Sequence, residues 1–236
     1  MSTIAFLDAN ILAKPFTRTL LWVGSRHSDF AVTWSQRAET EANRHLRPGA
    51  TPVGQLRKRY GMTRGPTGAD PERFGSTEEP DRQILADALA CRSAFLVTED
   101  VDDFGLVDLA SCGICAVHPD LFLAHRLSPD GYRAALEALS AGMSRPARRP
   151  ADVHTQAGRV HPLLVDAMRH VYPGVTPEPA SHHHPHEMFR GTSCVRCGRT
   201  LTSPDCVLCG VGPVMCSPKC QVRTVKTWWA ILGSNQ

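Results

Sequence analysis

The sequence has no long apolar run and few aromatic side chains. Aromatic residues make up 6% of its 236 residues, although apolar residues as a whole reach an ordinary 42%. A membrane-crossing helix needs about 20 consecutive apolar residues, and no basic segment followed by an apolar one precedes the first strand-like stretch. We therefore expect no membrane partner and a cytoplasmic location.

A strong excess of one charge is also missing. The chain carries 26 Lys and Arg against 23 Asp and Glu, a formal net charge of +3. This small excess permits an RNA partner without arguing for one, because phosphate affinity depends on local clusters of basic side chains. Arg57, Lys58, Arg59 and Arg64 form such a cluster. They predict either a surface for RNA phosphates or an ordinary solvated face.

Short apolar runs and helical patterns alternate along the first half of the chain. The runs typical of buried strands are residues 3–8, 30–34, 94–98 and 114–118. A helix is expected after Ser35, a favourable N-cap residue, and another after Pro80. Strands that alternate with helices favour an α/β fold with a parallel sheet covered on both faces.

Acidic residues follow the ends of these predicted strands. Asp8 ends the first strand, and Asp100 and Asp103 follow the third, where the chemistry of open α/β sheets collects. Glu41 and Asp81, on or beside the predicted helices, can join the same rim, although Asp81 alone also suits an ordinary helix N-terminus. Carboxylates that converge without basic partners repel one another unless a cation such as Mg²⁺ offsets their charge. The pattern therefore predicts metal-assisted phosphodiester hydrolysis.

Four stretches also resemble, in order, the acidic motifs of PIN-domain ribonucleases, most closely the bacterial VapC-toxin type. They are FLDANIL at 6–12, WSQRAETEANRHL at 34–46, DRQILADALA at 81–90 and FLVTEDVDDF at 95–104. The resemblance covers residues 1–125 and extends through the helical region to about 172. It implies a PIN-like parallel sheet flanked by helices and an endoribonuclease that depends on Mg²⁺ or Mn²⁺.

The resemblance also implies roles for individual residues. Asp8, Glu41 and Asp81 are expected to be catalytic, metal-holding acids, with Asp100 or Asp103 as the fourth. Asn10 and Thr98 are expected to support them. Glu41 is preferred to Glu39 because its distance from Trp34 matches the family's spacing. RNA is the expected substrate, and the family adds a toxin role, an antitoxin protein as a partner, and a homodimer as more specific expectations.

Six cysteines are packed near the end of the chain. They form Cys194-x2-Cys197, Cys206-x2-Cys209 and Cys216-x3-Cys220, and close thiolate pairs are typical of structural Zn²⁺ sites. The stretch resembles small zinc-binding modules in which Cys194, Cys197, Cys216 and Cys220 would be the ligands. Three roles stay open for Cys206 and Cys209: they replace the last pair, bind a second ion with His182–His186, or remain free.

These patterns divide the chain into four parts. They are a nuclease domain at 1–125, a helical extension packed on it at 126–172, a Pro- and His-rich linker at 173–191 and a zinc module at 192–236. The leading interpretation is a metal-dependent endoribonuclease. The alternative is a non-catalytic module that binds nucleic acid or protein, built on a PIN-like fold with a zinc finger.

Overall fold

The computed structural model describes residues 2–143, 147–180 and 188–192. The cysteines of the predicted zinc module and the tract His182–His186 lie outside the described residues. The described strands are β1 (Thr3–Leu7), β2 (Phe30–Thr33), β3 (Phe95–Val97), β4 (Cys115–Val117) and β5 (Phe189–Arg190). The four strands predicted from the sequence are therefore confirmed as β1 to β4.

These strands form one sheet in the order β2-β1-β3-β4-β5. The strands β1 to β4 pair in parallel, with Ala5 opposite Phe95 and Phe95 opposite Cys115. Every residue of β3 and β4 is buried, as expected for parallel strands covered on both faces. The α/β fold class and the mostly parallel sheet of the sequence analysis are confirmed.

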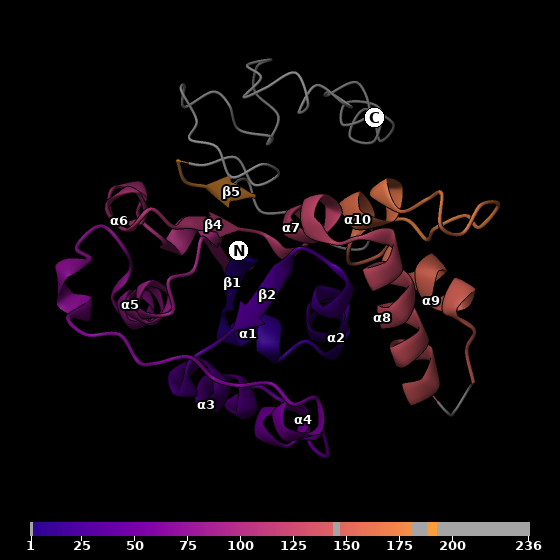
Figure 1. Cartoon of the computed structure of the whole chain (residues 1–236), viewed down its shortest axis with the longest axis horizontal. Coiled ribbons are helices and arrows are strands. Elements are labelled where there is room, and N and C mark those ends of the chain that lie inside the picture. The colour runs from indigo at the N-terminus through magenta and orange to yellow at the C-terminus, as the bar shows by residue number, and fades with distance from the viewer. Residues whose placement is uncertain (1, 144–146, 181–187, 193–236) are drawn as a thin grey trace.

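Helices connect and cover the strands. They are α1 (Ala9–Leu12), α2 (Pro15–Gly24), α3 (Gln36–Arg44), α4 (Val53–Arg59), α5 (Arg82–Ala90), α6 (Leu106–Cys112), α7 (Pro119–Arg126), α8 (Pro129–Gly142), α9 (Pro150–Ala157) and α10 (Pro162–Ala167). Figure 1 shows α5 and α6 on one side of the sheet and α2 and α8 on the other. As predicted, α3 begins after Ser35, whose side chain accepts a hydrogen bond from the Ala38 backbone N–H (3.2 Å). None of the described helices has the length and apolarity that crossing a membrane requires.

The fifth strand was not predicted. The sequence analysis assigned residues 189 and 190 to a linker, but they pair antiparallel with β4, and the His118 N–H donates to the Met188 carbonyl (2.8 Å). Met188 and Phe189 are 3% and 4% exposed. A two-residue strand is too short to produce a periodic pattern, so its partner strand decides its conformation.

The helical extension packs on the first half of the chain through close backbone contact. Ser128 caps α8 and also donates through its hydroxyl to the His27 carbonyl (2.6 Å). At the α2–α8 crossing, a Cβ atom added to Gly131 would lie 2.6 Å from the Gly24 carbonyl oxygen. Further along, the buried Asp120 side chain accepts hydrogen bonds from the backbone N–H groups of Leu163 (3.1 Å) and Leu164 (2.9 Å) at the start of α10.

We expect Gly131→Ala to destabilise the protein by about 1–3 kcal/mol, because the added methyl group meets backbone rather than a flexible side chain. Gly142→Ala, in the last turn of the same helix, is the matched control, since no atom of the described residues lies within 4 Å of its Cβ position. Urea unfolding of both variants measures the change. Equal stability of the two variants would contradict the close α2–α8 contact.

Candidate functional site

The candidate site lies at the point in the sheet where the connections from two adjacent strands run in opposite directions. The strands β1 and β3 are parallel neighbours, but β2 lies beyond β1 and β4 lies beyond β3. The connections that leave β1 and β3 therefore lead away from each other, and in open α/β sheets ligand sites collect at the carboxyl ends of such strands. Asp8 follows β1 directly, and Thr98 follows β3.

Asp8 is 6% exposed and accepts three hydrogen bonds at this edge of the sheet. Its Oδ1 accepts from the Ala9 N–H (2.6 Å), and its Oδ2 accepts from the Asn10 amide (2.9 Å) and the Thr98 hydroxyl (2.8 Å). The same Asn10 nitrogen lies 3.0 Å from Asp100 Oδ2. Asn10 and Thr98 thus tie Asp8 to the segment after β3, in positions that suit supporting residues.

Burial raises the pKa of Asp8 to about 7, although the hydrogen bonds from Thr98 and Ala9 lower it and the charges of Asp81 and Glu41 raise it. Desolvation disfavours the charged carboxylate, and neighbouring carboxylates add repulsion. The charge of Asp8 is therefore costly at neutral pH unless a cation lies nearby.

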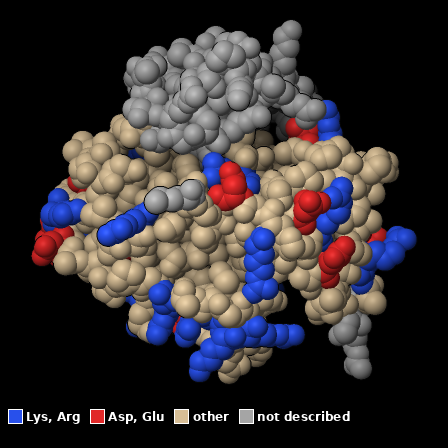
Figure 2. Space-filling model, viewed as in Figure 1, with Lys and Arg blue, Asp and Glu red and all other residues tan. Residues whose placement is uncertain are grey.

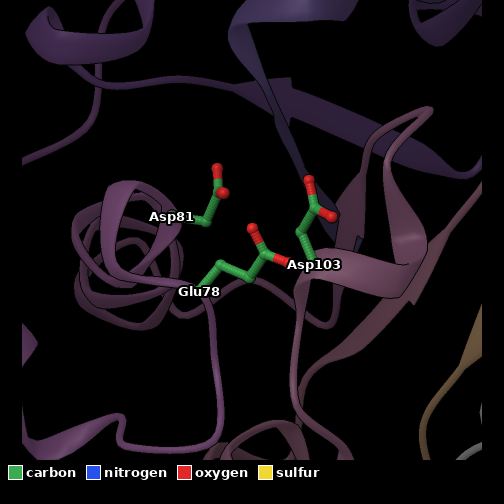
Figure 3. A group of neighbouring side chains, drawn as sticks. All are labelled: Glu78, Asp81 and Asp103. Atoms are coloured by element: carbon green, nitrogen blue, oxygen red, sulfur yellow. The ribbon is translucent and has the colours of Figure 1, made fainter.

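A second group of acids faces the same region. Figure 3 shows the carboxylates of Glu78, Asp81 and Asp103 turned toward one another from two turns of the chain, and one oxygen from each lies within 4.8 Å of the others. The two turns are joined directly, because the Glu78 N–H donates to the Asp103 carbonyl (2.9 Å). We call Glu78, Asp81 and Asp103 the acidic cluster.

The sequence analysis missed Glu78. The residue lies three positions before Asp81, at the start of the 3-10 helix η3 (Glu79–Asp81) that precedes α5. The buried Asp108 on α6 supports this position, since its Oδ2 accepts from the N–H groups of Ser76 (2.9 Å) and Thr77 (2.8 Å). The three-residue spacing of Glu78 and Asp81 is visible in the sequence. The hydrogen bonds from Ser76 and Thr77 to Asp108, which position Glu78, are not.

Asp81 lies close enough to several other acids for their charges to raise its pKa. Burial raises its pKa to about 6, and the charges of Asp103, Glu41, Glu78 and Asp100 raise it further. The structure therefore brings Asp81 and Asp103 into the acidic cluster and places Asp8 and Asp100 in contact with Asn10. Among the described residues, Asp8, Glu41 and Asp100 lie outside that cluster.

Glu39 and Glu41 differ in what surrounds them. Glu39 is 6% exposed, and its Oε2 accepts hydrogen bonds from Trp34 Nε1 (3.0 Å) and Arg57 Nε (3.1 Å). It therefore holds α4 against α3. Glu41 is half-buried and lines a shallow hollow on α3. Arg57, predicted as a contact for RNA, is thus engaged by Glu39, whereas Lys58 and Arg59 are exposed.

Arg190 of β5 clamps the turn that carries Asp103. Its Nη1 donates to the carbonyl oxygens of Asp102 (3.1 Å) and Phe104 (2.9 Å), on either side of Asp103, and its Nη2 lies 3.5 Å from Asp102 Oδ1. Burial and the charges of Glu78, Asp100 and Asp102 raise the pKa of Asp103, and Arg190 lowers it. The last described segment of the chain thereby reaches the candidate site.

This donor set suits a hard divalent cation. Carboxylate oxygens are the ligands that Mg²⁺ and Mn²⁺ prefer, and those of the acidic cluster already lie close together. Asp8 and Asp81 both have raised pKa values, which a nearby cation would lower. The residues present therefore fit such an ion.

We expect Asp8→Asn to change how stability depends on pH. The pKa of Asp8 rises from 3.8 to about 7 on folding, so the folded state binds the extra proton between these values and the metal-free wild type loses stability as the pH rises through them. Relative to wild type, Asp8→Asn should gain up to about 4 kcal/mol between about pH 4 and pH 8.

Urea unfolding in EDTA at the two pH values measures this gain. Asp130→Asn, a side chain 81% exposed at the start of α8, is the control and should show little change with pH. A constant difference between Asp8→Asn and wild type across the range would contradict the raised pKa.

We expect Arg190→Gln to raise the pKa of Asp103 further, because the variant removes a positive charge that lowers it. Titration of the labelled side-chain carboxyl carbon by NMR measures the pKa. Arg169→Gln on the exposed surface beyond α10 removes the same charge at a distance and should leave Asp103 unchanged. An unchanged or lower pKa in Arg190→Gln would contradict the clamp.

Similarity to known proteins does not identify this site. No protein-family model, no curated protein and no solved structure matches the chain. The residues of the site therefore carry the functional argument by themselves.

Proposed function

We propose that this protein is an endoribonuclease that hydrolyses RNA phosphodiesters with Mg²⁺ or Mn²⁺. One observation carries the proposal: carboxylates from distant parts of the chain gather where the sheet changes its direction of winding, and Asp8 and Asp81 have raised pKa values there. Such crowding is unfavourable in the protein alone. It becomes favourable when a divalent cation binds.

The residues that would hold the cation are Asp81, Asp103 and Glu78, with Asp8 beside them at the end of β1 and Glu41 and Asp100 at the rim. When bound, one or two divalent ions lower the pKa of water and offset the charge of the phosphate. Asp8 is the most buried of these acids and accepts the most hydrogen bonds, so we expect its carboxylate to be the most firmly held of the group.

Neighbouring polar residues orient these acids. Thr98 and Asn10 hold Oδ2 of Asp8 by hydrogen bonds of 2.8 and 2.9 Å, which leaves the side chain little rotational freedom. Asn10 also contacts Asp100 (3.0 Å), so one amide aligns acids from both strands. Arg190 aligns Asp103 by holding the two flanking carbonyl groups. Preorganised ligands of this kind raise metal affinity because less ordering is needed on binding.

The finer assignments rest on resemblance. The order of the four acidic motifs supports a PIN-like fold, and a toxin role with an antitoxin partner and a homodimer follows from the same likeness alone. The cysteine spacing supports a structural Zn²⁺ site, and the resemblance to small zinc-binding modules implies Cys194, Cys197, Cys216 and Cys220 as its ligands. We propose these features together with the nuclease activity.

Cleavage of a labelled single-stranded RNA by the full-length protein tests the proposal. We expect cleavage with Mg²⁺ or Mn²⁺ and none in EDTA. Asp8→Asn and Asp81→Asn should each lower the rate by at least about 100-fold, since each removes a charge that the metal requires. Asp130→Asn is the matched control, because it makes the same change on the exposed end of α8.

Two outcomes would contradict the proposal. Cleavage that persists in EDTA or in Asp8→Asn would indicate a contaminant or another site. RNA binding without cleavage under any of the metals would favour the alternative, a non-catalytic module that binds nucleic acid. Circular dichroism of each variant controls for loss of fold.

A further inference from the structure

A shallow hollow lies on the face of α3 that carries Glu41. It is lined by Arg37, Thr40, Glu41 and Arg44. These positions are spaced by three, four and seven residues, so they share one side of the helix. The hollow therefore combines two guanidinium groups with one of the acids of the proposed site.

Neither arginine is paired with that acid. Arg37 and Arg44 lie one helical turn before and after Glu41, where ion pairs commonly form, yet neither makes one with Glu41 in the part of the chain that the structure describes. Arg37 Nη2 donates one long hydrogen bond to the Pro80 carbonyl (3.4 Å). Within the same described residues, Arg44 has no hydrogen-bond or ion-pair partner.

The hollow is close to the acidic residues of the site. The charge of Glu41 raises the pKa values of both Asp8 and Asp81. Arg37 reaches across to Pro80, which immediately precedes Asp81. A ligand held between the two guanidinium groups would therefore lie beside the carboxylates and not on a distant surface.

The donors of the hollow suit an anion with several oxygens. The Thr40 hydroxyl already donates to the Gln36 carbonyl (2.8 Å), so the two guanidinium groups supply the donors. A guanidinium presents parallel N–H groups that match two oxygens of a phosphate. Figure 2 shows several Lys and Arg side chains along the lower edge of the molecule, where Figure 1 places α3 and α4. A chain of phosphates could continue along this edge.

We propose that the hollow on α3 is a binding site for a backbone phosphate of single-stranded RNA, next to the phosphodiester that is cleaved. Arg37 and Arg44 hold this phosphate beside Glu41, which is itself one of the proposed metal-holding acids. This inference rests on the proposed nuclease function, of which it specifies the substrate contact. It assigns RNA binding to α3 as well as to the exposed side chains Lys58 and Arg59 of α4.

RNA binding measured in EDTA tests the site without any need for cleavage. Fluorescence anisotropy of a labelled single-stranded RNA gives the affinity of wild type, Arg37→Gln, Arg44→Gln and the double variant over a range of salt concentrations. Each lost phosphate contact should reduce the slope of log affinity against log salt by about 0.7. The affinity should fall by a similar factor for RNAs of different sequence, because phosphates carry no sequence information.

The matched control is Arg133→Gln, which removes the same charge from α8, where Arg133 pairs with Asp130 (2.8 Å). It should leave the salt slope unchanged. Thermal unfolding of all variants controls for loss of fold. Polyglutamate serves as a competing polyanion without phosphate, and its binding should weaken less than that of RNA in the Arg37 and Arg44 variants.

The outcomes separate this inference from the proposed function. Arginine variants with an unchanged salt slope, in a protein that still cleaves RNA with Mg²⁺, would overturn the phosphate site alone. A reduced slope in a protein that never cleaves would support the site and overturn the nuclease. Arginine variants that lose polyglutamate but retain RNA would instead indicate an acidic protein partner and overturn the inference.

Discussion

Electrostatic repulsion among the gathered carboxylates is the physical constraint that shapes the candidate site. Asp8, Asp81 and Asp103 come from separate parts of the chain, and burial together with like charges raises the pKa of each. A fold that served stability alone would separate these groups or pair them with arginine. Here Asp8 follows β1, Asp103 lies in the turn after β3, and the hydrogen bond from Glu78 to Asp103 brings Asp81 to the same turn.

Other buried acids in the protein show how a structural carboxylate is satisfied. Glu39 is paired with Arg57, and Asp108 and Asp120 each accept two backbone N–H groups from a neighbouring segment. Each of these acids fastens one element to another. The acidic cluster differs, because its members face one another rather than a donor or a basic side chain. That contrast within one chain distinguishes the acidic cluster from ordinary core polarity.

The edge of the sheet takes part in holding the site. The strand β5 pairs with β4, buries Met188 and Phe189, and places Arg190 across the turn that carries Asp103. Arg190, more than 80 residues beyond Asp103 in the chain, thus helps to position Asp103 and lowers its pKa. The site is consequently a property of the sheet together with this late strand, and not of the first half of the chain alone.

The sequence by itself determined the alternating strands and helices and the N-cap at Ser35, because apolar runs and capping residues are local patterns, and it offered the five acids only as candidates. The order of strands, the addition of β5 and the inclusion of Glu78 were decided only by the tertiary structure. Those features depend on pairing and hydrogen bonds between residues far apart in the chain, such as Glu78 with Asp103 and Phe189 with Val117. The sequence determines which residues carry charge, but only the packed chain decides which of those charges meet, since repulsion and desolvation depend on distance in space.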